Sequence, residues 1–287
     1  MAGPTVAQGV SAHRARSVTA YDVLGWVSYT QFAAGERHVM VGRGPDRVEF
    51  DPDHVARLWR HRDRPTRGPR PELSAEAIVR AAIEIADAEG LGAVSMARVA
   101  ERVGSGTMSL YRHVSGKPEL IAAMLDRAIG PPPRSVPGHW RVRLRHWVDD
   151  TIEVFRRHPW ALSLATERRM RGPHEIAWFE TALSAIDGIG LSEREMAEVV
   201  LSVNAYALGA ARSAVDADAA ERLTGVTEDR WIPAFADFLQ RMADDARFPV
   251  LSRVVVSGAI TDPVGYEFGL DRLLDGVEGF VVRRNSE

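Results

Sequence analysis

Residues 74–130 read SAEAIVRAAIEIADAEGLGAVSMARVAERVGSGTMSLYRHVSGKPELIAAMLDRAIG, and this stretch decides the fold. Its first part repeats apolar residues at the spacing of a single helix face: Ile78, Ala81, Ala82, Ile85 and Ala88. Ser74 stands where an N-cap belongs, and Gly90 stands where a helix naturally ends. The pattern therefore predicts one helix between these two residues.

Three shorter helices are predicted after Gly90. Ser95 caps the second helix, which carries the apolar stripe Met96, Val99, Ala100 and Val103. After the glycine-rich break GSG, a very short helix runs from Thr107 to His113, with Leu110 as its inward anchor. Pro118 suits the first turn of the last helix, which continues to Ile129. Two short helices joined by a Gly-containing turn and braced by longer ones are typical of a helix-turn-helix unit.

The run SMARVAERVGSGTMSLYRHVSGKPEL, residues 95–120, resembles the DNA-binding domain of the TetR family of bacterial transcriptional regulators. The LYRHV core followed by Gly-Lys is the most specific part of this resemblance. It covers residues 74–130, and residues 131–287 are similar in layout to the ligand-binding domains of the tetracycline-repressor-like branch. The resemblance implies an all-α protein with a helix-turn-helix domain of three to four helices and an antiparallel helical domain for ligand binding and dimerisation.

The resemblance also implies residue roles. Lys117, the only lysine in the chain, and the Tyr111 hydroxyl would meet phosphates, and His113 would lie at the groove edge. The alternative for Tyr111 and His113 is packing of the short helix onto its neighbours. Relatives often contact DNA where this chain has Ala97, so either Arg98 substitutes or the contact is absent. The candidate DNA-binding residues are Ser95, Arg98, Thr107, Met108, Ser109, Tyr111, Arg112, His113 and Lys117.

The amino-acid composition limits the classes of protein to which this chain could belong. The chain has 287 residues, a net charge of −3, 45% hydrophobic residues and 26% charged residues, which is ordinary for a soluble globular protein. It contains no cysteine, which excludes disulfides and thiolate chemistry. We find no catalytic or metal-binding motif. We therefore expect no enzyme, no metal and no cofactor.

The expected location is the cytoplasm. No apolar run approaches the length of a membrane span, and the N-terminal stretch lacks the apolar core of a secretion signal. We therefore expect no membrane partner.

Residues 1–70 are predicted to form a small N-terminal extension that ends in an arginine-rich linker. Residues 39–50 read as a hairpin, and a short helix follows from Asp51 to about His61. This arrangement weakly resembles the wing of excisionase-type DNA-binding domains, and the alternative is an extension that packs on the body. The linker, from Arg60 onward, is either a solvated spacer or an arm that contacts DNA phosphates or the minor groove. Arginine is concentrated over residues 57–70: Arg57, Arg60, Arg62, Arg64, Arg67 and Arg70.

Residues 131–287 are predicted to be helical throughout, after a helix-turn-helix domain that spans residues 71–130. The expected helices begin near Trp140, Trp160, Gly172, Ser192 and Asp229, and a last one begins at Pro263. Candidate ligand-binding residues are polar or aromatic groups within apolar helices: His146, Trp147, Trp178, Phe179, Asn204 and Tyr206. For Asn204 and Tyr206 the alternative is an internal hydrogen bond. The broad apolar face of the last helix predicts a homodimer contact through Leu270, Leu273, Val277 and Phe280.

These features predict a dimeric transcriptional regulator, most simply a repressor, that binds double-stranded DNA at a palindromic operator and is released by an unidentified small molecule. The alternatives are a transcriptional activator, a regulator without a ligand, or a non-specific DNA-binding protein whose C-terminal domain contacts other proteins. The sequence does not specify the effector, the operator or the target genes.

Overall fold

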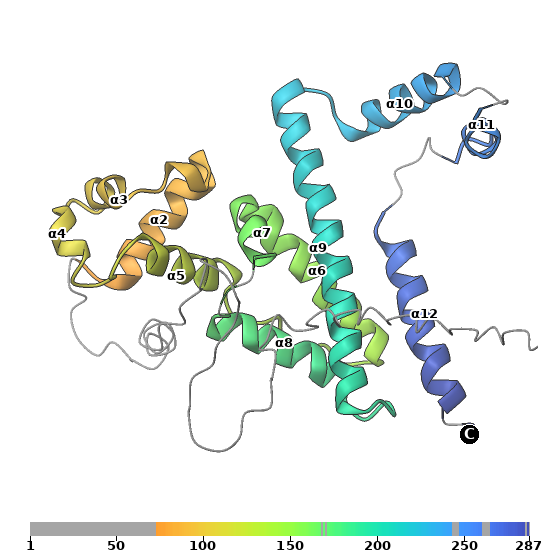
Figure 1. Cartoon of the computed structure of the whole chain (residues 1–287), viewed down its shortest axis with the longest axis horizontal. Helices are drawn as coiled ribbons and strands as arrows, with labels where there is room; N and C mark the ends of the chain where they lie inside the picture. Colours follow the sequence, from red (N-terminus) through yellow and green to blue (C-terminus); the bar gives the residue numbers. More distant parts are fainter. Residues whose placement is uncertain are drawn as a thin grey trace, which may run out of the picture. The chain divides into compact units, whose positions relative to one another are not determined.

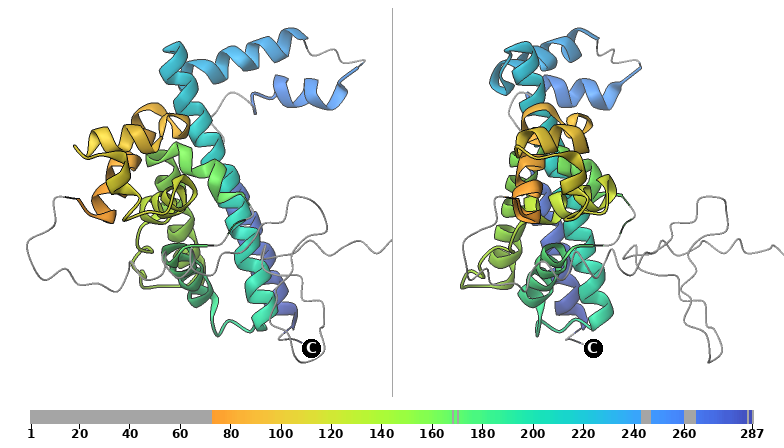
Figure 2. Two further views of the ribbon diagram at one scale, coloured as in Figure 1. Left: turned by 60° about the vertical axis from the view of Figure 1, so that its left-hand side comes forward. Right: turned by 90° about the vertical axis from the view of Figure 1, so that its left-hand side faces the viewer.

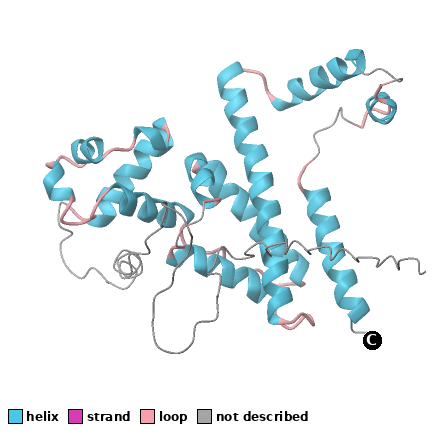
Figure 3. Cartoon of the chain, in the orientation of Figure 1, coloured by secondary structure: helices cyan, strands magenta, loops and turns pink. Residues whose placement is uncertain are grey.

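The computed structural model describes residues 73–167, 169, 171–242, 247–259, 265–284 and 286, and every regular element in this part of the chain is helical (Figure 3). The helices of the N-terminal half are α2 (Ala75–Glu89), the 3₁₀ turn η1 (Leu91–Ala93), α3 (Met96–Arg102), α4 (Thr107–Leu110) and α5 (Lys117–Ile129). They are followed by α6 (Trp140–Arg157), α7 (Pro159–Ala165), α8 (Pro173–Ile186), α9 (Glu193–Thr224), α10 (Glu228–Met242), α11 (Pro249–Val256) and α12 (Glu267–Arg284) (Figure 1). The prediction of an all-α protein is confirmed. The predicted extension, hairpin and arginine-rich linker lie outside the described residues.

The predicted helix ends agree with the observed caps. The Ser74 hydroxyl accepts a hydrogen bond from the Ala77 amide at 3.1 Å, and the Ser95 hydroxyl accepts one from the Arg98 amide at 3.3 Å. Gly90 ends α2 with φ of 84°, a backbone conformation that side chains with a Cβ rarely adopt. These interactions are local, which is why the sequence alone could place them.

A small apolar core holds α2 to α5 together. Leu110 is fully buried and is the single buried side chain of α4. It packs in a core with side chains from the other three helices and the turn before α3: Ile78, Ala82, Val94, Val99, Leu120 and Met124. The orientation of α4 therefore depends on one leucine.

The long helices α6 and α9 form the centre of the C-terminal half, where they lie side by side with α8 (Figure 2). Ser192 and Glu195 form the predicted capping box, in which the Ser192 amide donates to the Glu195 carboxylate at 2.7 Å. The buried stripe of α9 consists of small and β-branched residues that allow close helix approach: Val200, Val203, Ala207, Ala211 and Val215. This helix continues to Thr224, about two and a half turns beyond the predicted Val215.

Helix α12 packs on the same chain with more of its apolar face than expected. Leu270 and Leu274 are fully buried and Val277 is 9% exposed. Leu270 and Val277 were expected at the contact with a second copy, but they are already covered by the chain's own core. Of the four expected interface residues, Leu273 is half-buried and Phe280 is 41% exposed, so only these two remain accessible.

Ion pairs tie α12 to α6. Arg141 bonds to Asp275 at 2.5 Å and to Glu278 at 2.9 Å, and Arg145 bonds to Asp271. Successive residues of each cluster are three or four positions apart, which places them on one helix face. These ion pairs link α12 to α6, in addition to the packing of α12 on α9.

Helix α10 presents its aromatic residues to solvent rather than to a core. Trp231 is 59% exposed, Phe238 is 49% exposed and Met242 is 62% exposed. Phe235 stacks between the Trp231 and Phe238 rings, with centroids 6.0 and 6.4 Å away. The neighbouring helix α11, which sequence analysis did not identify, also exposes Val250 and Val254. This apolar surface has no covering element in the described part of the chain.

Candidate nucleic-acid interface and effector pocket

Helix α4 and the turn that follows it carry six of the nine predicted DNA-binding residues. The regular helix ends at Leu110, and the predicted extension to His113 is a turn in which the His113 amide donates to the Leu110 carbonyl at 2.8 Å. Because Leu110 points into the core, Met108 and Tyr111 point outward and are 80% and 47% exposed.

The polar residues around α4 form a small network. The Arg112 guanidinium, which is exposed, donates to the Ser109 hydroxyl at 3.0 Å. Thr107 and His113 are half-buried, so part of each side chain supports the turn. The predicted residues of α4 and its turn therefore lie on one continuous stretch, and Met108, Tyr111 and Arg112 are its most accessible members.

Lys117 begins α5 beside this surface and is exposed. The loop before it is held by Glu119, a buried carboxylate that accepts from the Ser115 amide at 2.8 Å and from the Ser115 hydroxyl. Glu119 thus fixes the turn from which Lys117 projects. Sequence analysis did not identify this supporting residue, although Glu at the third position of a helix is a known capping signal.

Arg98 does not point into solvent as an unpaired cation. Its guanidinium bonds to the two carboxylate oxygens of Glu89 at 2.5 and 2.9 Å. This hydrogen bond lowers the pKa of Glu89 and raises that of Arg98. Both side chains are about half exposed, at 44% for Arg98 and 50% for Glu89, so a phosphate would compete with Glu89 for Arg98. Ser95 is the N-cap of α3, and its hydroxyl accepts a hydrogen bond from the Arg98 amide.

Only part of the predicted ligand site is brought together. The indole of Trp147 donates to the Trp178 carbonyl at 3.0 Å, and the indole of Trp178 donates to the Gly130 carbonyl at 3.1 Å. Tyr206 donates to the Tyr266 carbonyl at 2.6 Å and packs against Gly269, where a Cβ would lie 2.2 Å from its hydroxyl. Trp178 and Tyr206 therefore stabilise the fold through these hydrogen bonds. Phe179 and Asn204 are half-buried and do not line the pocket described next.

A pocket of about 260 Å³ lies between the segment that follows α5, helix α6 and helix α8. His146 and Trp147 are the two predicted ligand residues that line it. The other lining residues were missed by sequence analysis: Pro133, Arg134, Ser135, Val136, Arg143, Glu180, Thr181, Ser184 and Ala185. Two arginines against one glutamate suit a ligand with an acidic group beside an apolar body.

Arg143 is the pocket residue with an unmet hydrogen-bonding requirement. Its terminal nitrogen reaches the Ser184 carbonyl at 3.4 Å, a long contact, and its buried Nε has no hydrogen-bond partner within the described residues. An unsatisfied buried donor costs free energy. A ligand group that draws this guanidinium into a better position would therefore be favoured.

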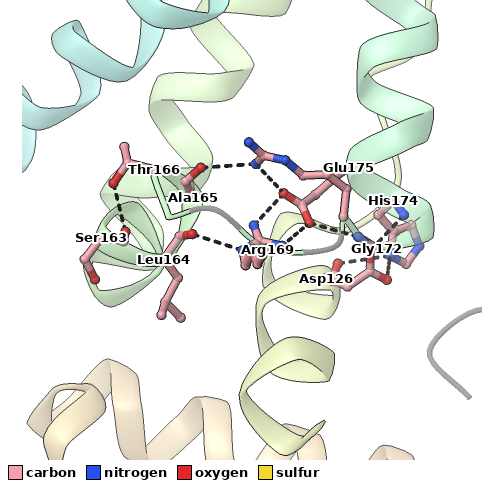
Figure 4. Close-up of polar contacts among 10 residues, drawn as sticks. Asp126, Ser163, Leu164, Ala165, Thr166, Arg169, Gly172, His174 and Glu175 are labelled. Atoms are coloured by element: carbon pink, nitrogen blue, oxygen red, sulfur yellow. Dashed lines mark hydrogen bonds and ion pairs between the residues drawn. The ribbon is translucent and has the colours of Figure 1, made fainter. Parts of the chain in front are cut away.

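A dense polar joint connects α5 to α8 (Figure 4). The Asp126 carboxylate, which is buried, accepts from the His174 amide at 2.8 Å and contacts the His174 ring nitrogen Nδ1 at 2.9 Å. Gly172 lies so close that a Cβ would be 2.1 Å from the nearer Asp126 oxygen. Only glycine fits at this position.

Glu175 forms the second half of the joint. Its carboxylate bonds to Arg169 at 2.6 and 2.7 Å, to Arg171 at 3.1 Å and to the Gly172 amide at 3.0 Å. Burial acts to raise the pKa of Glu175, but the bonds and charges of these arginines outweigh it and hold the pKa below its ordinary value. Sequence analysis identified Gly172 only as the start of a helix, and it could not find the pairing of Asp126 with His174 because these residues are 48 positions apart.

A second link runs from α2 to α7. Asp87 accepts from the Trp160 indole at 2.6 Å and contacts the His158 ring nitrogen at 2.8 Å. The helices that carry the exposed α4 surface are therefore tied to the C-terminal helices at two separate aspartates.

Comparison with known proteins places the chain in a family. Residues 78–124 match "Bacterial regulatory proteins, tetR family", and residues 132–281 match "Tetracyclin repressor-like, C-terminal domain". The chain belongs to the tetR family. Its similarity to the HTH-type transcriptional repressor DrrR1 of Streptomyces coeruleorubidus is 40% identity over 233 residues, which is 80% of this chain and 86% of that protein. This tetR-family chain is a DNA-binding transcriptional regulator, and its family confirms that it is not an enzyme.

Solved structures show the same fold. Apo ActR from Streptomyces coelicolor has a TM-score of 0.62 at 24% identity, over 75% of this tetR-family chain and 100% of ActR. ActR in complex with actinorhodin has a TM-score of 0.60 at 25% identity, over 71% of this chain and 94% of that one. No described helix of this regulator is long and apolar enough to cross a membrane, and no cluster of three metal-ligating side chains occurs among the described residues.

Proposed function

We propose that this regulator is a homodimeric repressor that binds a palindromic operator and is released by a small molecule bound in the α6–α8 pocket. The observation that carries the proposal is the position of α5. Lys117 begins this helix beside the α4 surface, Asp126 near its end bonds to α8, and the segment that follows it lines the pocket.

The proposed mechanism is a shift between two conformations. A ligand in the pocket contacts Arg134 and Ser135 after α5, as well as α6 and α8. If it binds better when α5 is displaced, it stabilises a dimer whose α4 surfaces no longer match successive major grooves. The structure of the relative ActR in complex with actinorhodin supports a small-molecule effector for this chain as well.

The proposed dimer would use the uncovered apolar surfaces of α10 and α12. Phe268 and Phe280 on α12 are 67% and 41% exposed, and the aromatic stripe of α10 is uncovered. Neighbouring exposed apolar side chains mark an interaction surface, and pairing across a two-fold axis would bury this surface on both copies. Phe280→Asp should dissociate the dimer in sedimentation, whereas Val142→Asp, at a 51% exposed apolar residue of α6, should not.

The deciding experiment for the whole proposal is a footprint on DNA next to the regulator's own gene, repeated with a panel of acidic aromatic metabolites. We expect a protected inverted repeat that one compound class abolishes. Protection without sequence preference would overturn the operator assignment. Release that is unchanged in Arg143→Gln and His146→Ala would overturn the pocket assignment.

A further inference from the structure

Met108 is the most exposed large hydrophobic side chain in the described part of the helix-turn-helix region. It is 80% exposed, and the other exposed large hydrophobic side chain there, Tyr111, is 47% exposed and has a hydroxyl group. Leaving a methionine in water gains nothing for the stability of this domain. Its side chain therefore has no part in the core of this domain and is available to contact a bound duplex.

The geometry of α4 points Met108 away from the protein. Successive helix residues are about 100° apart, so Met108 lies roughly 200° around the helix from Leu110, two residues later. Leu110 is fully buried and anchors the opposite face. A side chain diametrically opposite the anchor of the second helix faces the major groove in a helix-turn-helix complex.

The chemistry of methionine restricts what it can recognise there. Its thioether has no donor and is at best a weak acceptor, so it cannot read the hydrogen-bonding edges of bases. In the major groove the apolar group that distinguishes one base pair is the C5-methyl of thymine. Ser109 and Arg112, which bond to each other at 3.0 Å, supply polar groups beside it.

We infer that Met108 determines specificity by packing on the 5-methyl group of one thymine in each operator half-site. This inference rests on the proposed operator binding. An unbranched, polarisable side chain can adapt to the position of that methyl group, which a β-branched residue could not do as readily.

The test removes the methyl group from the DNA. An operator is selected from random duplexes with the full-length protein, and each thymine is then replaced singly by deoxyuridine, which keeps every hydrogen-bonding group. At one thymine per half-site, wild-type affinity should fall roughly fourfold, the effect of one buried methyl-sized group. At the other thymines the change should be small.

Variants assign the effect to Met108. Met108→Gln keeps the length of the side chain but replaces its apolar end with an amide. This variant should therefore bind the thymine duplex and the uracil duplex with about equal affinity at that position. Met108→Leu should keep most of the discrimination. An operator with cytosine at that position should be bound more tightly when 5-methylcytosine replaces the cytosine, and this gain should be absent in Met108→Gln.

Two results would overturn the inference, and they are distinguishable. If selection yields no preferred duplex, the proposed function fails and the inference fails with it. If a preferred duplex is found but each thymine-to-uracil replacement lowers the affinity of wild type and of Met108→Gln equally, only the inference fails. Unchanged melting temperatures for both variants would confirm that the comparison is between folded proteins.

Discussion

The α4 surface and the α5–α8 joint use polar residues in opposite ways. At the α4 surface, the polar residues Tyr111, Arg112 and Lys117 are exposed, and the buried side chain of Leu110 anchors the short helix. At the joint, Asp126 is buried and Glu175 is half-buried, and each carboxylate has several hydrogen bonds. The first arrangement leaves donors for a partner to complete, whereas the second is already complete and resists change. We therefore expect joint variants to alter stability, and surface variants to alter DNA affinity alone.

The largest expected effect is that of Gly172→Ala. The added Cβ would lie 2.1 to 2.7 Å from three Asp126 atoms, so the buried aspartate must move and lose its bonds to His174. Disrupting a buried network of this kind costs about 3 kcal/mol. Thermal unfolding should show the loss. Gly209→Ala, in a helix position with open space around it, is the control and should be neutral or slightly stabilising. Equal effects of the two variants would show that the joint is not tightly packed.

Glu175→Gln should give a smaller loss that depends on pH. Removing the charge leaves Arg169 and Arg171 without their shared carboxylate, which should cost about 2 kcal/mol at neutral pH. Because the folded pKa of Glu175 lies below its ordinary value of 4.5, the wild-type contribution is present above that value. It disappears as the pH falls through the folded pKa.

The measurement is the difference in unfolding free energy between wild type and Glu175→Gln at a series of pH values. The difference should be constant near neutrality and shrink below about pH 4.5. A difference that grows as the pH falls would contradict the direction of the shift.

At the α4 surface, Lys117→Ala and Tyr111→Phe should weaken operator binding by about three- to tenfold without changing the preferred sequence, because phosphate contacts position rather than specify. The Lys117 variant should also reduce the slope of log affinity against log salt concentration by about one unit. Arg127→Ala, which removes a cation from the other end of α5, is the matched control and should leave the salt slope unchanged. An altered sequence preference with an unaltered slope would refute the phosphate assignment.

The smallest effect is expected from Glu89→Gln. Freed from Glu89, Arg98 could reach a phosphate, so affinity should rise about twofold and the salt dependence should steepen. Glu84→Gln removes the same charge from the same helix but releases Arg102 instead. If both variants raise affinity equally, the gain comes from net charge, and Arg98 is not a DNA contact.

The sequence by itself determined the local features of this protein. The helix period, Ser74, Ser95 and the Ser192–Glu195 box placed helix starts correctly, because caps and amphipathic faces are set by residues three or four positions apart. The same local reasoning identified Leu110 as the anchor of α4, and hence which residues point outward.

Tertiary structure decided how distant residues are paired. Many arginines could pair with many carboxylates, so nothing in the sequence selected Glu89 for Arg98 or His174 for Asp126, 48 positions away. Nor could the pattern of α12 show that its own chain buries Leu270 and Val277, since an apolar face fits a core and a second copy equally well. Burial and charge pairing depend on three-dimensional distance, which helix periodicity does not contain.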